Sequence, residues 1–238
     1  ILLAEDGSDN RDLLSCYLQS AGGQITLAEN GRIACDLEIE ARRNGQPFDL
    51  VVLDMQMPEL DGYGAASRLR ATGFKGPIIA LTAHAMADDR EKCIRSGCSD
   101  YLSKPVDRAR LIQVVAQSLG AAQAPASDTA PAAVEESSME RNETRETRED
   151  QAILQKFLPQ FIDHLPGQVA QIEAMLRQRS IEQLAQAVHQ IKGTAGMYGF
   201  PEVSALAARA EVAARGFKPP ADPDVLAREV QPLIELIR

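Results

Sequence analysis

Short apolar runs alternate with helical patterns along the first 120 residues of the chain. The clearest run, Leu50–Leu53, is unbroken and stops at Asp54, which is typical of a strand buried on both faces of a parallel sheet. Between the runs, apolar residues recur at helical spacing. The expected strands cover residues 1–4, 24–28, 50–53, 77–82 and 100–103. This alternation predicts an α/β domain with a doubly wound, five-stranded parallel sheet.

The pattern changes after the last of these helices. Residues 121–134 are mostly Ala, Pro, Ser and Thr without a period, which favours a flexible tether. Residues 135–150 carry mixed charge and fit either solvated coil or the exposed start of a helix. We therefore divide the chain into a first domain at 1–120, a linker at 121–147 and a second domain at 148–238.

Every apolar pattern after the linker has helical spacing. One stripe runs from Ile153 to Ile162 and contains Pro159, which we expect to kink the helix or mark an early turn. Pro166 is predicted to start the next helix. Further helices are expected from Ile181, Pro201 and Pro223. Long helices with short connections predict an antiparallel, four-helix-type bundle.

Composition narrows the possible partners and the setting. The chain has 238 residues, a net charge of -9 and a pI of about 4.9, which disfavours nucleic acid and anionic membranes as partners. No apolar run approaches the roughly 18 residues of a membrane span. The four cysteines lack paired zinc-type spacing and are expected to be reduced thiols of a cytoplasmic protein. The chain begins at Ile1 inside an apparent strand, so we expect it to be a fragment.

Residues able to do chemistry collect at the ends of four predicted strands. They are Glu5 and Asp6 after the first strand, Asp54 after the third, Thr82 on the fourth and Lys104 after the fifth. Carboxyl ends of parallel strands meet at one edge of the sheet. An isolated Asp could simply cap the next loop, but this set suits Mg²⁺ and a phosphoryl group. An aspartate there can act as a nucleophile and carry an acyl phosphate.

These residues give the first domain a resemblance to a response-regulator receiver domain. The matching segments are Glu5-Asp6, Asp54-Met55-Gln56-Met57-Pro58, Asp61-Gly62, Thr82-Ala83 and Lys104-Pro105. The resemblance covers the whole first domain and implies the flavodoxin-like strand order 2-1-3-4-5. Gly7 departs from the Asn that is often found after the acidic pair.

The resemblance also implies a role for each matching residue. Asp54 would accept the phosphoryl group, which Lys104 would hold and towards which Thr82 would turn its hydroxyl. Mg²⁺ would be held by Asp6 directly, by Glu5 through water, by Asp54 and by the Gln56 carbonyl. Ala83 would lie beside the phosphoryl group, and Tyr101 resembles the aromatic residue that moves with Thr82.

One helix of the second domain carries a second reactive pattern. His189, Lys192, Gly193 and Gly196 are spaced at i, i+3, i+4 and i+7 and share one face. The apolar stripe of this helix lies beside them, so His189 is predicted to point towards solvent. Each helical glycine costs about 1 kcal/mol against Ala, and bare backbone beside the ring would let a large partner approach. A surface His, with glycines that permit close helix packing, is the alternative.

The same stretch resembles the histidine-containing phosphotransfer (HPt) domain. His189-Gln-Ile-Lys192-Gly193-Thr-Ala-Gly-Met-Tyr-Gly199 matches that family's motif, with Ile191 where Leu is common and Thr194 where Ser is common. The resemblance covers residues 148–238. It implies that His189 accepts the phosphoryl group, that Lys192 stabilises it and that Gly193 leaves room for it.

Together the two resemblances indicate the C-terminal part of a hybrid sensor histidine kinase that works in a two-component phosphorelay. An upstream kinase histidine would phosphorylate Asp54, and His189 would carry the group to or from a receiver aspartate, in the same chain or in another. The parent kinase would be membrane-anchored or cytoplasmic, and this fragment has no ATP-binding domain. The apolar residues Leu13, Leu14 and Tyr17 are a candidate docking surface for the HPt helix.

Two other functions remain open at this point. A binding or sequestering module would fold in the same way without moving phosphate, but its signature, the loss of an acid, Thr or Lys, is not found in the sequence. A Mg²⁺-dependent phosphohydrolase would use Asp54 covalently, yet the chain offers neither a second catalytic acid beside Asp54 nor an evident substrate lid.

Overall fold

The computed structural model describes residues 1–83, 87–123, 136–217 and 223–238. The chain forms two compact units, Ile1–Leu154 and Gln155–Arg238.

The first unit is built on the predicted parallel sheet. Its five strands lie in the order β2-β1-β3-β4-β5, and every neighbouring pair is parallel. The strands are β1 (Leu2–Ala4), β2 (Thr26–Ala28), β3 (Val51–Asp54), β4 (Ile78–Thr82) and β5 (Asp100–Ser103). The fold class and the strand order are therefore confirmed. Every residue of β3 is buried, as its unbroken apolar run predicts.

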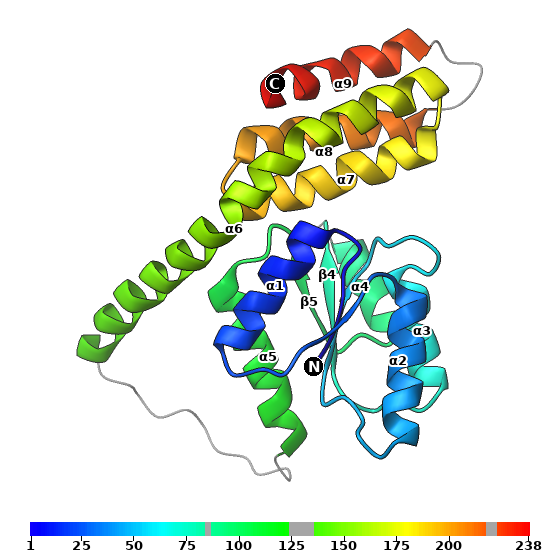
Figure 1. Ribbon diagram of the computed structural model, residues 1–238. Coiled ribbons are helices and arrows are strands. Elements are labelled where there is room, and N and C mark those ends of the chain that lie inside the picture. The colour runs from blue at the N-terminus through cyan, green and yellow to red at the C-terminus, as the bar shows by residue number, and fades with distance from the viewer. Residues whose placement is uncertain (84–86, 124–135, 218–222) are drawn as a thin grey trace. The chain divides into compact units, whose positions relative to one another are not determined.

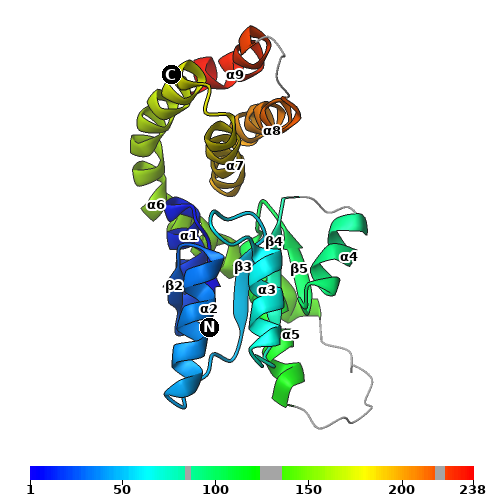
Figure 2. The ribbon, with the colours of Figure 1, turned by 90° about the vertical axis from the view of Figure 1, so that its right-hand side faces the viewer.

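Helices cover both faces of this sheet. They are α1 (Ser8–Ser20), α2 (Gly31–Arg43), α3 (Gly62–Ala71), α4 (Ala87–Arg95) and α5 (Arg108–Gln123). Figure 1 shows α1 and α5 on one side of the sheet and α2, α3 and α4 on the other, and Figure 2 looks onto the side that carries α2 and α3. The Asn30 side chain caps α2 by accepting the Ile33 N–H at 2.9 Å. This arrangement leaves the carboxyl ends of the strands together at one edge.

The predicted docking surface on α1 is wrong in this structure. Leu13, Leu14 and Tyr17 are all buried rather than open to a partner. Helix α1 packs against β1 and α5, so these side chains form part of the interior.

Burial raises the pKa of Tyr17 to about 12, and the nearby Asp150 carboxylate contributes to the rise.

The second unit is helical, as predicted. Its elements are α6 (Glu136–Gln178, which begins in the first unit), α7 (Ile181–Met197), α8 (Pro201–Gly216) and α9 (Pro223–Ile237). In Figure 1, α7, α8 and α9 run side by side with the second half of α6. Phe161 of α6 stacks on Tyr198 with ring centroids 4.6 Å apart. This aromatic contact fastens α6 to the end of α7.

Helix α6 differs from the expectation that Pro166 starts a separate helix. It runs through both Pro159 and Pro166 without a break. Both prolines lie on the exposed side, where carbonyls that lose their N–H partner can bond to water, so packing of the opposite side keeps the helix continuous. Helix α6 also starts at Glu136, inside the predicted linker, so the charged segment is helical rather than coil. The rest of the predicted tether, 124–135, lies outside the described residues.

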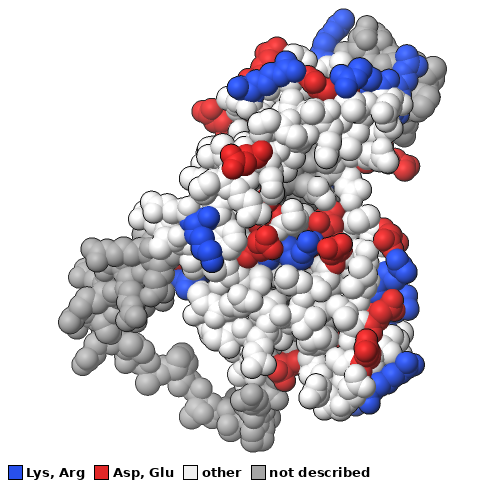
Figure 3. Space-filling model, viewed as in Figure 1, with Lys and Arg blue, Asp and Glu red and all other residues white. Residues whose placement is uncertain are grey.

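The surface gives no sign of a large basic patch on the face shown in Figure 3. Among the described residues drawn there, Lys and Arg side chains are dispersed and acidic side chains lie among them. In the described part of the chain, no helix combines the length and the apolar character needed to cross a membrane.

Candidate functional site

Three charged side chains meet at the carboxyl edge of the sheet. Glu5 follows β1, Asp54 ends β3 and Lys104 follows β5. The Lys104 ammonium lies 2.8 Å from Glu5 Oε2 and 2.7 Å from Asp54 Oδ2. Asp54 is 1% exposed and the Lys104 side chain 3%. The sequence-based expectation that these residues converge is therefore met.

Lys104 is held in its charged form by this arrangement. Burial alone would lower the pKa of Lys104, but the Asp54 and Glu5 carboxylates outweigh burial and raise the pKa. Because Asp6 adds a third carboxylate, three acids face one lysine. The formal net charge of the cluster is therefore negative by two units, which favours a divalent cation.

The geometry of the acids fits a metal ion. Ligand oxygens of Glu5, Asp6 and Asp54 lie within 4.8 Å of one another. Gln56, two residues beyond, donates its backbone N–H to Asp54 Oδ1 at 3.1 Å. Carboxylate and carbonyl oxygens are the ligands that Mg²⁺ prefers. The three acids predicted as ligands thus lie at one place.

Two further residues that the sequence reasoning missed support the acids. The Asn10 side-chain amide donates to Glu5 Oε1 at 3.2 Å, and Arg11 donates to the Glu5 carbonyl at 2.9 Å. Both lie in the first turns of α1, directly after the acidic pair. Polar residues are ordinary in that position, so nothing in the sequence pattern distinguishes them.

The positions of three further predicted residues follow from strands β4 and β5. They are Thr82, Ala83 and Tyr101. Thr82 ends β4 and is buried, and its carbonyl accepts the Lys104 N–H at 2.7 Å. Ala83 follows directly and is half-buried. Tyr101 pairs in register with Ala80, two residues before Thr82, and packs against the core.

The loop after Asp54 needs a glycine. The Asp61 side chain caps α3 by accepting the Gly64 N–H at 2.7 Å. A Cβ added to Gly62 would overlap the Asp54 carbonyl oxygen and lie 2.7 Å from Met55 Cα. No side chain fits there unless the backbone around Asp54 moves, so Gly62 helps to fix the position of the acid.

The second unit holds a different cluster, between α7 and α8. His189 Nδ1 lies 2.9 Å from Glu211 Oε1. Because His189 is 4% exposed in the whole chain, the prediction of an exposed imidazole is wrong. The ring is turned onto α8, where Glu211 binds it, rather than extended into solvent.

Glu211 binds two further cations. Lys192 Nζ lies 3.1 Å from Glu211 Oε2, and Arg215 Nε donates to Glu211 Oε1 at 3.0 Å. Burial would raise the pKa of Glu211, but His189 and Lys192 outweigh it and lower the pKa to about 2. Glu211 is therefore a carboxylate at neutral pH.

This charge state decides the tautomer of His189. A carboxylate only accepts hydrogen bonds, so Nδ1 carries the proton and, in the neutral ring, Nε2 carries the lone pair. Among the described residues, Nε2 has no hydrogen-bond partner. The nitrogen that could act as a nucleophile is therefore uncommitted, and the other nitrogen is fixed.

Glu211 was missed by the sequence reasoning, although the sequence carries a signal for it. It lies four residues after Ala207, and Ala207, Ala210 and Ala214 are all buried. An acid on the apolar face of a helix requires a partner. Gly193, which was singled out, lies one turn after His189 on α7 and is buried.

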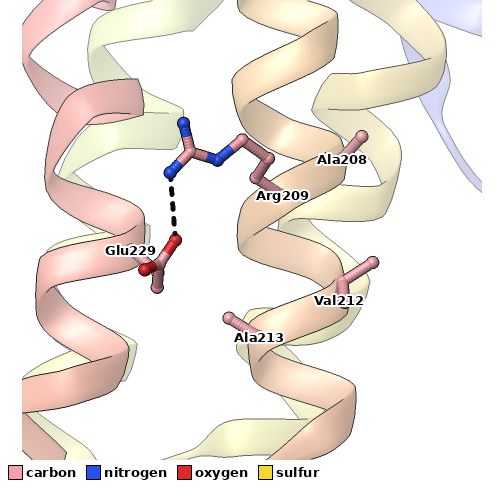
Figure 4. Close-up of a pocket in the computed structure, with 5 residues that line it drawn as sticks. All are labelled: Ala208, Arg209, Val212, Ala213 and Glu229. Atoms are coloured by element: carbon pink, nitrogen blue, oxygen red, sulfur yellow. Dashed lines mark hydrogen bonds and ion pairs between the residues drawn. The ribbon is translucent and has the colours of Figure 1, made fainter.

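A hollow of about 460 Å³ lies on the surface between α8 and α9, away from this cluster. Ala208, Val212 and Ala213 line it, with an ion pair between Arg209 and Glu229 at 3.3 Å (Figure 4). Its lining offers no nucleophile, so we assign it no chemistry.

Comparison with known proteins identifies both units. A family model described as a response regulator receiver domain matches residues 1–116, and one described as an Hpt domain matches residues 156–238. The sensor histidine kinase GacS of Pseudomonas protegens is 30% identical over 222 residues, which cover 89% of this chain and 24% of that protein. The signal transduction histidine-protein kinase BarA of Escherichia coli K12 is 27% identical over 215 residues, which cover 87% of this chain and 23% of that protein.

One solved structure is the receiver domain of a sensor histidine kinase from Pseudomonas aeruginosa PAO1, with a magnesium ion coordinated in its active site cleft. It is 39% identical, with a TM-score of 0.42, and the match covers 50% of this chain and 95% of that chain.

Proposed function

Because this chain joins a response regulator receiver domain to an Hpt domain, and so belongs to the proteins of two-component phosphorelays, we propose that Asp54 and His189 are the residues that carry the phosphoryl group. The observation that supports this most is the pair of buried clusters, each with one oriented nucleophile and one lysine. Neither of the alternatives, a sequestering module or a phosphohydrolase, has a specific observation in its favour.

In the receiver, Asp54 acts as the nucleophile. A carboxylate oxygen attacks phosphorus of a donor phosphohistidine, the P–N bond breaks, and its electron pair returns to the donor imidazole, which becomes neutral. Lys104 already lies against Asp54 Oδ2 and would turn to the incoming phosphoryl oxygens. Thr82, at the adjacent strand end, would donate its hydroxyl to the same group.

A magnesium ion would be held by Asp6, Asp54 and the Gln56 carbonyl, with Glu5 acting through water. The ion would neutralise the phosphoryl oxygens and the surplus carboxylate charge. Support comes from the ligand oxygens of the three acids, which lie within 4.8 Å of one another, and from their excess over Lys104. Glu5 is kept in place by Asn10 and Arg11.

In the Hpt domain, Nε2 of His189 acts as the nucleophile. Its lone pair attacks the phosphorus of a receiver acyl phosphate, the P–O bond breaks and the aspartate carboxylate is regenerated. No proton has to leave Nε2, because Glu211 holds the proton on Nδ1. The positive charge that the ring gains is stabilised by Glu211, and Lys192 would pair with the phosphoryl oxygens. Gly193 leaves the backbone bare one turn away.

The donor and the final acceptor would lie outside this chain. The chain spans about a quarter of the length of the GacS and BarA kinases that it matches. We propose an upstream histidine kinase domain as the donor to Asp54, and a response-regulator receiver as the partner of His189. Because such donors draw on ATP, the chain would work in the cytoplasm.

A labelling experiment tests this assignment. The chain is treated with a radiolabelled small phosphodonor and Mg²⁺, and acid-stable label on aspartate is followed against alkali-stable label on histidine. Asp54→Asn should abolish the first and His189→Gln the second. Label that survives both substitutions would contradict the assigned residues, and no label on the unaltered chain would favour the sequestering module.

A further inference from the structure

The carboxylate of Glu211 is shared unequally among three donors. Oε1 accepts from both His189 Nδ1, at 2.9 Å, and Arg215 Nε, at 3.0 Å. A second guanidinium nitrogen, Nη2 of Arg215, also lies 3.0 Å from this oxygen. Oε2 contacts Lys192 Nζ at 3.1 Å. Arg215 therefore binds the same oxygen that orients the imidazole, whereas Lys192 binds the other.

Without Arg215, the formal charges of this cluster sum to zero. Glu211 and Lys192 cancel, and His189 is neutral as a nucleophile. Arg215 thus provides a formal surplus of one positive charge before any phosphoryl group arrives. Lys192 lies three residues after His189 on the same helix. When a phosphoryl group binds at Nε2, the Lys192 ammonium can pair either with that group or with Glu211.

We propose that Arg215 is a positioning residue, which holds Glu211 in place against the imidazole so that Lys192 can leave the carboxylate for the phosphoryl group. This inference rests on the proposed role of His189. If Lys192 were the sole cation at Glu211, its departure would leave a buried carboxylate facing only the imidazole, which is costly. With Arg215 in place, Glu211 keeps a charged partner throughout the transfer.

The positions of Arg215 and Lys192 suit these two different roles. Arg215 lies one turn after Glu211 on α8, so its guanidinium group reaches Glu211 Oε1 without strain in the helix. Its side chain is 52% exposed, so about half of it is open to solvent. Lys192, on α7, is tied to the bundle through its carbonyl, which accepts from Ser204 Oγ at 2.8 Å, while its ammonium lies at the end of a flexible stem.

Arg209 provides a matched control on the same helix. Its side chain is 63% exposed and pairs with Glu229 of α9 at 3.3 Å, outside the cluster (Figure 4). Arg209→Gln and Arg215→Gln each remove one positive charge and one ion pair from α8. A general effect of charge or of helix stability would be common to both variants, and only Arg215→Gln disturbs Glu211.

The test follows alkali-stable label on this two-domain chain after treatment with a radiolabelled phosphodonor and Mg²⁺. Arg215→Gln should lower the rate of His189 labelling about 3- to 10-fold, the scale of one partly exposed, hydrogen-bonded ion pair. Arg209→Gln should stay within about 2-fold of the unaltered chain. Arg215→Lys keeps the positive charge but not the planar guanidinium group. It should recover part of the labelling rate that Arg215→Gln loses.

A double-mutant cycle separates positioning from mere stabilisation. If Arg215 acts by releasing Lys192, Arg215→Gln should have little further effect in a Lys192→Gln background. Equal losses in both backgrounds, or equal effects of Arg215→Gln and Arg209→Gln, would overturn the proposal. Label that persists in His189→Gln would instead overturn the proposed role of His189, so the two failures are distinguishable.

Discussion

The receiver and the Hpt domain use the same kinds of side chain in opposite roles. In the receiver, the carboxylate of Asp54 is the proposed acceptor, and Lys104 is its counter-ion at 2.7 Å. In the Hpt domain, the carboxylate of Glu211 binds the proposed acceptor, His189, and also binds a lysine. In the mechanism that we propose, the acid is the nucleophile in one unit and the support of the nucleophile in the other.

This difference gives the two sites opposite charge. The receiver cluster sets three acids against one lysine, which favours a cation before a phosphoryl group approaches. The Hpt cluster sets one acid against a lysine and an arginine, which favours an anion. The proposed acyl phosphate and phosphohistidine would each be stabilised by a different balance of charge.

The largest effect is expected when the lysine is removed from each cluster. Lys104→Met leaves Glu5 and Asp54 buried without a counter-ion and should lower the free energy of unfolding of the receiver by about 3–5 kcal/mol. Lys192→Met should cost the Hpt domain about 1 kcal/mol, because Arg215 still pairs with Glu211. Urea unfolding in Mg²⁺-free buffer measures both. Equal losses would contradict the contrast.

The next test titrates the acid that orients His189. At pH 7, Glu211→Gln should lower the free energy of unfolding by about 2 kcal/mol, since it weakens hydrogen bonds to charged partners. The pKa of Glu211 is lowered to about 2 from 4.5. Its contribution is therefore complete above pH 4.5 and is lost as the pH falls towards 2. Urea unfolding at pH 7, 4.5 and 3 should show the two proteins converging; a constant difference would be inconsistent with this pKa.

A smaller effect is expected from the metal itself. At ten times its dissociation constant, Mg²⁺ should stabilise the receiver by about 1.4 kcal/mol and leave the Hpt transition unchanged. Asp6→Asn should abolish this shift, and the comparable surface change Asp36→Asn should not. Thermal unfolding with Mg²⁺ or with a chelator distinguishes the two domains. A shift in the Hpt transition would show that its cluster also recruits the ion.

The smallest effect concerns a buried acid outside both clusters. Glu38 is fully buried, neither of its oxygens has a hydrogen-bond partner among the described residues, and Arg42 lies 3.5 Å away. Glu38→Leu should change the free energy of unfolding by at most about 1 kcal/mol, with stabilisation as the expected sign. Phosphoryl labelling should be unchanged. A loss of labelling would mean that a buried acid outside both clusters matters to the site.

The sequence was sufficient wherever the evidence lies within one element. The unbroken run before Asp54 predicted a buried central strand, and five such runs predicted the sheet and its reactive edge. The spacing of His189 and Lys192 on one helix marked the second site.

What the sequence could not give depends on contacts between elements. His189 and Glu211 are 22 residues apart on different helices, so the direction of the ring was decided by a partner that spacing does not reveal. The same holds for Pro166, which was expected to start a helix. Its effect depended on which side of α6 faces solvent, and only the packed structure fixes that side.

Gly62 also limits how this protein can vary over generations. Every other amino acid brings a Cβ, and at this position that atom would meet the backbone that carries Asp54. Gly22 is also a glycine, but its surroundings are open and its φ of +90° needs only a residue that tolerates the left-handed region. In a library of all single substitutions under selection, position 62 should retain glycine alone, while position 22 should admit asparagine.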